Sequence, residues 1–220
     1  MSEPDPTRHV QKWEKRESQL LSEHRIFKIR EDNAVNPRTG SEHKMVVLEC
    51  PDWVNIIALT PERELVLVEQ YRQGSETVEL EIPGGMMDPG ETDPVITAVR
   101  ELTEETGYTG ENAHKIGECF ANPAIMNNRV HTILVENCRL TNEVQFDAGE
   151  DLVTVLVKAD DLPQMVKEGK IRHSIVLAAL QFSAILTLSD LQQSLALSLQ
   201  ALQENIYSLL YTSDAAHEEE

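Results

Sequence analysis

The chain has 220 residues, of which 40% are hydrophobic and 26% charged, a composition typical of a globular protein with a sizeable core. Its formal net charge of −19 at pH 7 argues against nucleic acid and anionic membranes as partners, because both require a basic surface. No apolar run approaches the roughly 18 residues of a membrane span, and the polar N-terminus is unlike a signal peptide, so we expect a cytoplasmic protein without a membrane partner.

The first half of the chain is predicted to be rich in strands. Residues 1–20 are polar, and we expect them to form a flexible segment. Short apolar runs bounded by turn residues then predict strands at 26–29, 45–48, 53–59, 65–68 and 78–82. Turn residues lie at 36–40 and 60–63, and the sequence Pro-Gly-Gly at 83–85 predicts a loop.

A helix is predicted at 94–106. Asp93 is placed to cap it, Pro94 suits its first turn, and Gly107 is placed to end it. At 100° per residue, one apolar stripe faces the sheet, and it consists of Val95, Ala98, Val99, Leu102 and Thr106. The charged residues 100, 101, 104 and 105 lie on the other side of this helix.

The second half of the chain is predicted to contain strands at 115–120, 130–135 and 152–157. A helix at 160–168, closed by Gly169, and another from Ser174 would follow. Regularly spaced leucines predict a separate amphipathic helix at 188–211, and we expect the acidic residues 212–220 to be a disordered tail. Residues 21–187 then form one domain of the α/β (α+β) class, a layered sandwich.

Three cysteines, Cys50, Cys119 and Cys138, are widely spaced. No C-x-x-C pair is present, so the sequence predicts neither a zinc site nor a disulfide framework. We expect three reduced thiols in the core, where cysteine behaves as a small hydrophobic residue.

The predicted helix at 94–106 carries two carboxylates one turn apart, those of Glu101 and Glu105. Like charges at this spacing repel each other, and a bridging cation would remove the conflict. Oxygen ligands of this kind suit Mg²⁺ or Mn²⁺. Acidic residues opposite an apolar stripe are also typical of a merely solvated helix face. The preceding Pro-Gly-Gly turn favours a site, because glycine lets the backbone come close to the helix.

These residues resemble a family motif. Gly85, Glu91 and the sequence Arg-Glu-Leu-Thr-Glu-Glu-Thr-Gly-Tyr at 100–108 resemble the Nudix box, which is G, five residues, E, seven residues, then R-E-U-x-E-E-x-G-U, where U is aliphatic or aromatic. Eight residues, not seven, separate Glu91 from the arginine, and we place the extra residue in the turn at 92–94. The resemblance implies a Nudix-type α/β/α sandwich with a mixed sheet and N-terminal antiparallel strands, to which the helix at 188–211 would be added.

The resemblance also implies roles for the box residues. Glu101 and Glu105 would be metal ligands with Glu104 assisting, and the backbone carbonyl of Gly84 would complete the protein's part of the shell. Arg100 would orient the glutamates by ion pairing, while its alternative role is a surface salt bridge with Glu104.

The flanks of the box resemble the branch of the family that cleaves ADP-ribose and nucleoside diphosphate sugars. The similarity covers roughly residues 20–187 and includes the sequences at 69–72, 79–83, 149–152 and 168–171. It implies a substrate-binding set that consists of Arg72, Glu81, Gly85 and Pro123. Three of these have a plainer interpretation: a surface cation for Arg72, an edge-strand charge for Glu81, and a strand end for Pro123.

In this branch a glutamate on a loop near residue 150 serves as the general base. Glu150 is the candidate, with a glutamate of the box, Asp151 and Glu143 as alternatives, although solvated carboxylates are common in such acidic turns. His131, on a predicted strand, is more typical of a core or face residue than of a catalyst.

The sequence therefore predicts a hydrolase that uses Mg²⁺ (or Mn²⁺) to split ADP-ribose into AMP and ribose 5-phosphate, or to split a related nucleoside diphosphate sugar. Two alternatives stay open. One is a Nudix hydrolase for dinucleoside polyphosphates, NADH or coenzyme A, and the other is a non-catalytic Nudix-fold module that binds a ligand. Relatives in the branch are commonly dimers, so we expect a homodimer, with the helix at 188–211 as a candidate interface.

Overall fold

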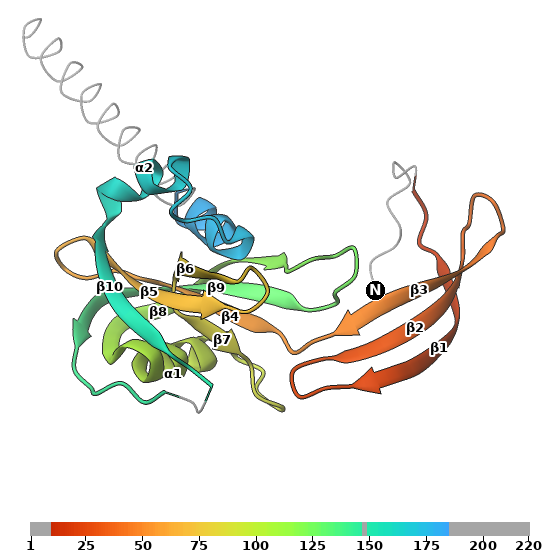
Figure 1. The fold of residues 1–220 in the computed structure, drawn as a ribbon, viewed down its shortest axis with the longest axis horizontal. Coiled ribbons are helices and arrows are strands. Elements are labelled where there is room, and N and C mark those ends of the chain that lie inside the picture. The colour runs from red at the N-terminus through yellow and green to blue at the C-terminus, as the bar shows by residue number, and fades with distance from the viewer. Residues whose placement is uncertain (1–9, 147–148, 185–220) are drawn as a thin grey trace, which may run out of the picture. The chain divides into compact units, whose positions relative to one another are not determined.

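The structure is a computed structural model that describes residues 10–146 and 149–184 (Figure 1). The chain divides into two compact units, Met1–Ala179 and Leu180–Glu220. Of the second unit, residues 180–184 are described; they are helical, and the Ser183 hydroxyl donates to the Leu180 carbonyl at 2.9 Å. The helix predicted at 188–211 and the tail at 212–220 lie outside the described residues, and the predicted limits of the central domain at 21–187 stay a prediction.

The elements of the first unit follow one another in the order β1 (Glu14–Glu23), β2 (Lys28–Val35), β3 (Glu42–Glu49), β4 (Trp53–Ala58), β5 (Glu64–Arg72), β6 (Thr77–Glu81), β7 (Gly84–Met86), α1 (Pro94–Thr106), β8 (Tyr108–Phe120), β9 (Arg129–Leu140), β10 (Leu152–Lys158), the 3₁₀ turn η1 (Ala159–Asp161) and α2 (Leu162–Lys167). Residues 174–179 are also helical. Of the helices in the described residues, none combines the length and the apolar character needed to cross a membrane.

The first sheet is an antiparallel meander in the order β1-β2-β3. Its first strand corrects an expectation, because residues 14–20 were predicted to be flexible and instead pair with β2. This strand is exposed along almost its whole length, so it carries no apolar alternation that would reveal it. Backbone pairing and the 2.6 Å hydrogen bond from Ser18 to the Asp32 carboxylate hold it in place.

The central sheet has the order β7-β4-β9-β8. It is mixed, as predicted, because β4 runs parallel to β9 while the other two pairs are antiparallel. Helix α1 packs on one face of this sheet, and together they bury a cluster made up of Val54, Ile56, Ala58, Val66, Met87, Ala98, Leu102, Ile133, Val135 and Cys138. Neighbouring strand residues point to opposite faces, and accordingly the Asn55 amide donates to the Ile175 carbonyl at 3.1 Å. The helical residues 174–179 therefore cover the other face (Figure 1).

Helix α1 begins and ends where the sequence predicts. The Asp93 side chain accepts a 2.9 Å hydrogen bond from the Val95 amide, and Gly107 adopts a φ of 74° with its amide bonded to the Thr103 carbonyl. The predicted packing stripe is partly wrong, because Val99 is exposed whereas Glu101 and Glu105 are buried. The helix packs against β7 at the edge of the central sheet and also against β10, and the glycines of β7 lie over the two carboxylates.

The third sheet, in the order β10-β5-β6, carries two of the remaining predicted site residues, Arg72 and Glu81. Leu152 at the start of β10 pairs with Gln70 near the end of β5, which places the loop before β10 beside Arg72. The strand β7 (Gly84–Met86) lies where we expected only a loop. Strand pairing with β4 is invisible to a reading of local sequence, in which Pro-Gly-Gly predicts a break.

Candidate active site

The carboxylates of Glu101 and Glu105 lie on adjacent turns of α1, beneath the two glycines of β7. Their residues are only 8% and 5% exposed. The Gly84 amide donates to Glu105 Oε2 at 3.1 Å, which ties β7 to the helix. A Cβ at position 85 would overlap the Glu101 carboxylate, so only glycine leaves room for that carboxylate. The Pro-Gly-Gly sequence is therefore explained by the close approach of β7 to these two acids.

Nearby positive charge compensates only in part for the burial of the two acids. Burial raises the pKa of Glu105 to about 8; the charges of Glu101 and Glu150 also raise it, while the Gly84 amide and Arg72 lower it. Burial likewise raises the pKa of Glu101 to about 7, and Arg100 offsets only part of this. Both carboxylates are thus held where their ionised form is costly, a condition that a bound cation would relieve.

Arg100 lies between the box glutamates. Its Nη1 is 3.0 Å from Glu101 Oε1 and 2.9 Å from Glu104 Oε2. The two roles considered for Arg100 are therefore compatible, because it forms the surface salt bridge with Glu104 and also pairs with the buried Glu101. Glu104 itself is the more exposed of its two partners.

The extra residue of the box lies in the turn before α1 and leaves the helix regular. Glu91 Oε2 accepts hydrogen bonds from the Asp88 amide at 2.8 Å and the Thr97 hydroxyl at 2.7 Å. The Asp88 amide is the largest of the causes that lower the pKa of Glu91. Glu91 therefore ties the loop to α1, and the distance from its Oε2 to Arg100 Nη2 is 3.8 Å.

Glu150 reaches this site from a loop far along the sequence. The loop passes α1, where the Gln145 amide donates to the Glu104 carbonyl at 2.8 Å, and then enters β10 beside β5. The charge of Glu150 is among the causes that raise the pKa of both Glu101 and Glu105. The alternatives Glu143 and Asp151 are exposed.

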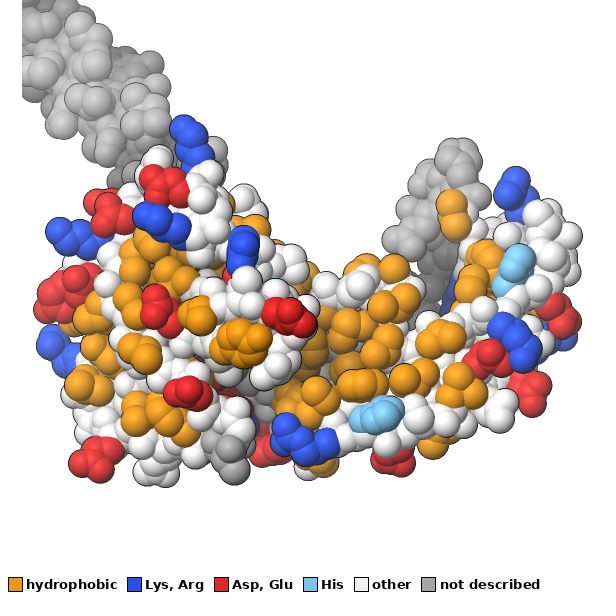
Figure 2. All heavy atoms as spheres, in the orientation of Figure 1, with side chains coloured by type: hydrophobic (Ala, Val, Ile, Leu, Met, Phe, Trp, Pro, Cys, Tyr) orange, Lys and Arg blue, Asp and Glu red, His pale blue; other side chains and the backbone are white. Residues whose placement is uncertain are grey.

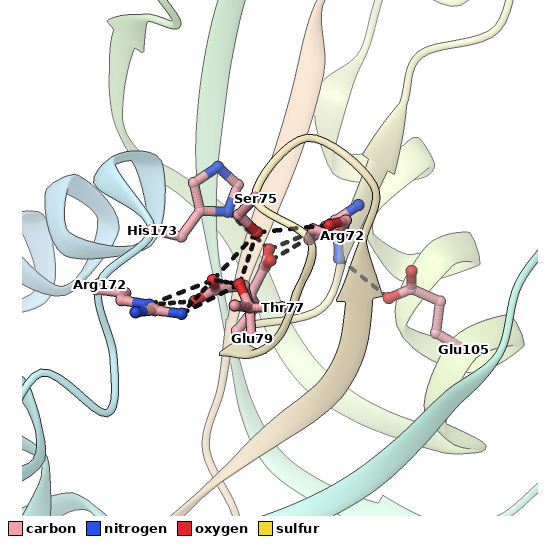
Figure 3. Close-up of polar contacts among 9 residues, drawn as sticks. Arg72, Ser75, Thr77, Glu79, Glu105, Arg172 and His173 are labelled. Carbon is pink, nitrogen blue, oxygen red and sulfur yellow. Dashed lines mark hydrogen bonds and ion pairs between the residues drawn. The ribbon is translucent and has the colours of Figure 1, made fainter.

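Arg72, at the end of β5, forms a two-pronged ion pair with Glu81 of β6 (Figure 3). Its Nε and Nη2 lie 2.8 and 2.9 Å from the two carboxylate oxygens. Glu81 is only 3% exposed; burial opposes its ionisation, yet hydrogen bonds from Arg72 and His173 hold its pKa at about 2. Arg72 also interacts electrostatically with Glu105, so the arginine joins the third sheet to the carboxylates of α1.

His173 is a member of this site that the sequence did not reveal. Its Nδ1 lies 2.7 Å from Glu81 Oε2, although the two residues are 92 positions apart. No motif marks it, and a lone histidine after a short helix carries no signal by itself.

Two predicted residues lie apart from the acids of α1. Pro123 is exposed in the turn between β8 and β9, and this turn is bonded to β3 through the Leu48 amide and the Ile125 carbonyl at 2.8 Å. His131 is buried between Asp52 and Glu118, 3.3 and 3.5 Å away, in a groove at the loop before α1. This placement agrees with its reading as a face residue of the sheet.

The donor set of the site fits a magnesium ion. Within residues 10–146 and 149–184, no three side chains of His, Cys, Asp or Glu are arranged to hold a metal by themselves. Mg²⁺, however, keeps several waters and usually takes one or two protein carboxylates together with substrate phosphates. Two buried, undercompensated carboxylates beside a space that a Cβ would fill match this requirement.

Comparisons with known proteins agree with this geometry. The NUDIX domain model matches residues 51–180. The "Methanol dehydrogenase activator" of Bacillus methanolicus is 32% identical over 159 residues, which is 72% of this chain and 85% of the relative. The "ADP-ribose pyrophosphatase" of Bacillus subtilis (strain 168) is 31% identical over 144 residues, 65% of this chain and 77% of the relative. A crystal structure described as an "ADP compounds hydrolase" superposes with a TM-score of 0.73 at 18% identity, covers 84% of this chain and 98% of its own, and shows the same fold.

Proposed function

The chain belongs to the Nudix hydrolase family, and from this premise we propose that it hydrolyses the diphosphate linkage of ADP-ribose or a related nucleoside diphosphate sugar. The observation that carries the proposal is the pair of buried carboxylates, Glu101 and Glu105. Their burial is offset only in part, by Arg100 at Glu101 and by Arg72 at Glu105. A divalent cation bound with a diphosphate supplies the missing positive charge. The diphosphate gives Arg72 a phosphate oxygen to bind. The name of the Bacillus subtilis relative, an ADP-ribose pyrophosphatase, supports this choice of substrate.

We propose that Glu101, Glu105 and the Gly84 carbonyl hold Mg²⁺, or Mn²⁺ in its place, with Glu104 assisting. A divalent cation in such a site neutralises the diphosphate and lowers the pKa of a bound water. The burial of the two carboxylates strengthens their attraction for a cation, because few waters compete there.

The chain's own residues then have distinct tasks. Arg72 binds a phosphate oxygen of the substrate, and Arg100 orients the box glutamates by ion pairing. Glu150 accepts the proton of the attacking water while the water oxygen bonds to phosphorus and the bridging P–O bond breaks. For ADP-ribose the products are AMP and ribose 5-phosphate. Glu81, Gly85 and Pro123 stay predicted substrate-binding residues.

A product analysis across substrates tests this function. The wild-type protein is incubated with Mg²⁺ and, in turn, ADP-ribose, ADP-glucose, GDP-mannose, UDP-glucose, NADH and diadenosine polyphosphates. We expect a nucleoside monophosphate and a sugar phosphate from ADP-ribose, at the highest kcat/KM of the panel. If the nucleoside diphosphate sugars are not hydrolysed while NADH or dinucleoside polyphosphates are cleaved rapidly, the chain acts on a different class of substrate. No hydrolysis of any compound, with binding retained, would indicate a ligand-binding module.

We also propose that the protein is a cytoplasmic homodimer. Its three free thiols suit a reducing compartment. The β1-β2-β3 sheet exposes the hydrophobic residues Leu20, Leu21, Met45 and Val46, and Figure 2 shows hydrophobic side chains gathered on this part of the molecule. Exposed apolar side chains on this sheet suit contact with a second copy of the chain. Light scattering at micromolar concentration is expected to give twice the monomer mass, and a monomer would rule the proposal out.

A further inference from the structure

The segment that follows α2 touches the β5–β6 hairpin through two neighbouring side chains (Figure 3). Arg172 pairs with Glu79 at 2.8 Å and donates to the Thr77 hydroxyl at 3.1 Å. His173 places its Nδ1 2.7 Å from Glu81 Oε2. The two contacts join the same segment to the same strand, yet only the second involves the carboxylate that holds Arg72.

Glu81 connects His173 to Arg72. Its Oε1 accepts from Arg72 Nε, and its Oε2 accepts both from Arg72 Nη2 and from His173. A two-pronged pair fixes the plane of a guanidinium group relative to its carboxylate. The terminal torsion of a glutamate is itself broad, so the orientation of the carboxylate needs a further donor. His173 is that donor, and it is seated on a different element from both members of the pair.

The remaining nitrogen of the arginine is available to a ligand. Arg72 uses Nε and Nη2 for Glu81, and within the described residues its Nη1 makes no hydrogen bond. The charge of Glu105 also acts on Arg72, so Arg72 lies on the side of the hairpin that faces the carboxylates of α1. The plane imposed by Glu81 therefore decides where Nη1 points.

We propose that His173 is a positioning residue, which acts through Glu81 to aim Arg72 at the diphosphate of the substrate. This inference rests on the proposed function, in which Arg72 binds a phosphate oxygen. The contact requires only an N–H at Nδ1, which a neutral imidazole in the appropriate tautomer and an imidazolium both provide. An asparagine at this position offers an amide N–H close to the same place, whereas alanine offers none.

The test is steady-state kinetics of five variants on the nucleoside diphosphate sugar that the wild type hydrolyses best. His173→Ala is expected to raise KM by roughly tenfold, the worth of a lost charged hydrogen bond, and to leave kcat within about twofold, because Arg72 binds ground state and transition state alike. His173→Asn is expected to restore most of the affinity. In an Arg72→Gln background, His173→Ala is expected to add almost nothing to KM.

Arg172→Gln is the matched control. It removes the neighbouring contact between the same segment and the same strand but leaves Glu81 untouched. Its KM is expected to stay at the wild-type value even where its melting temperature falls as far as that of His173→Ala. An equal rise of KM in Arg172→Gln would show that the segment merely supports the hairpin, and an undiminished effect in the Arg72→Gln background would show that His173 does not act through Arg72. Either result overturns the proposal.

These results are distinguishable from a failure of the proposed function. A wild type that hydrolyses no compound of the panel contradicts the function itself. In that case the same variants are compared by calorimetry with an α,β-methylene analogue of ADP-ribose and Mg²⁺. Equal affinities of wild type and His173→Ala would then reject the positioning role independently of turnover.

Discussion

Replacing Glu105 by glutamine is expected to lower kcat/KM for ADP-ribose in Mg²⁺ by about 10³-fold or more, and at the same time to stabilise the metal-free protein. The loss follows because a neutral amide cannot serve as an anionic ligand, and the charge stabilisation by such a cation is worth several kcal/mol, where each 1.4 kcal/mol is about tenfold in rate. The gain follows because a buried carboxylate with a pKa of about 8 is costly to ionise, and glutamine has no charge to bury. Steady-state kinetics with Mg²⁺ and thermal unfolding in EDTA at pH 8 measure the two effects.

Glu62→Gln provides the control, because it makes the same chemical change at an exposed turn residue. It is expected to alter neither activity nor stability measurably. Gly85→Ala perturbs the same site without removing a charge. Because its methyl group would displace the Glu101 carboxylate, it is expected to weaken Mg²⁺ binding strongly. A kcat/KM of Glu105→Gln within tenfold of the wild-type value would show that binding of the cation does not depend on this carboxylate.

The free energy of unfolding of the metal-free protein is expected to fall as the pH rises from about 5 to about 9. Folding raises the pKa of Glu101 to about 7 and of Glu105 to about 8, so over this range the folded chain binds more protons than the unfolded chain. Stability then decreases with pH, and one unit of pKa corresponds to about 1.4 kcal/mol, so the total fall is several kcal/mol. Glu81, with a pKa of about 2, acts in the opposite sense, because its ionised form stabilises the folded chain. This contribution to stability is lost only as the pH falls below the pKa that Glu81 has in the unfolded chain.

Urea unfolding in EDTA across this pH range measures the slope, and the same series in Mg²⁺ provides the comparison. A cation that binds only the folded state is expected to restore stability at pH 8 in proportion to the logarithm of its concentration over Kd. The double variant Glu101→Gln, Glu105→Gln is expected to lose both the slope and the response to Mg²⁺. A stability that rises between pH 5 and pH 9 in EDTA would contradict the assigned burial of the two acids.

The features that the sequence determined are those encoded within one element. The limits of α1, its Asp93 cap and its Gly107 end depend on a few adjacent residues, and the structure confirms them. The Nudix box spans a single loop and helix, so its spacing was sufficient to identify the family, which the domain match then showed. The mixed sheet followed from the same resemblance and is confirmed.

The tertiary structure decided what depends on segments far apart in the chain. The pairing of β10 with β5 brings Glu150 beside the carboxylates of α1. The packing of β7 on α1 covers those carboxylates, which the periodicity of the helix had placed on its solvated side. The contact of His173 with Glu81 likewise joins residues 92 positions apart. Local patterns record which face of an element is apolar, but a charge is buried by whatever the rest of the chain places over it. That is why the sequence predicted the reaction, while the environment of its acids came only from the fold.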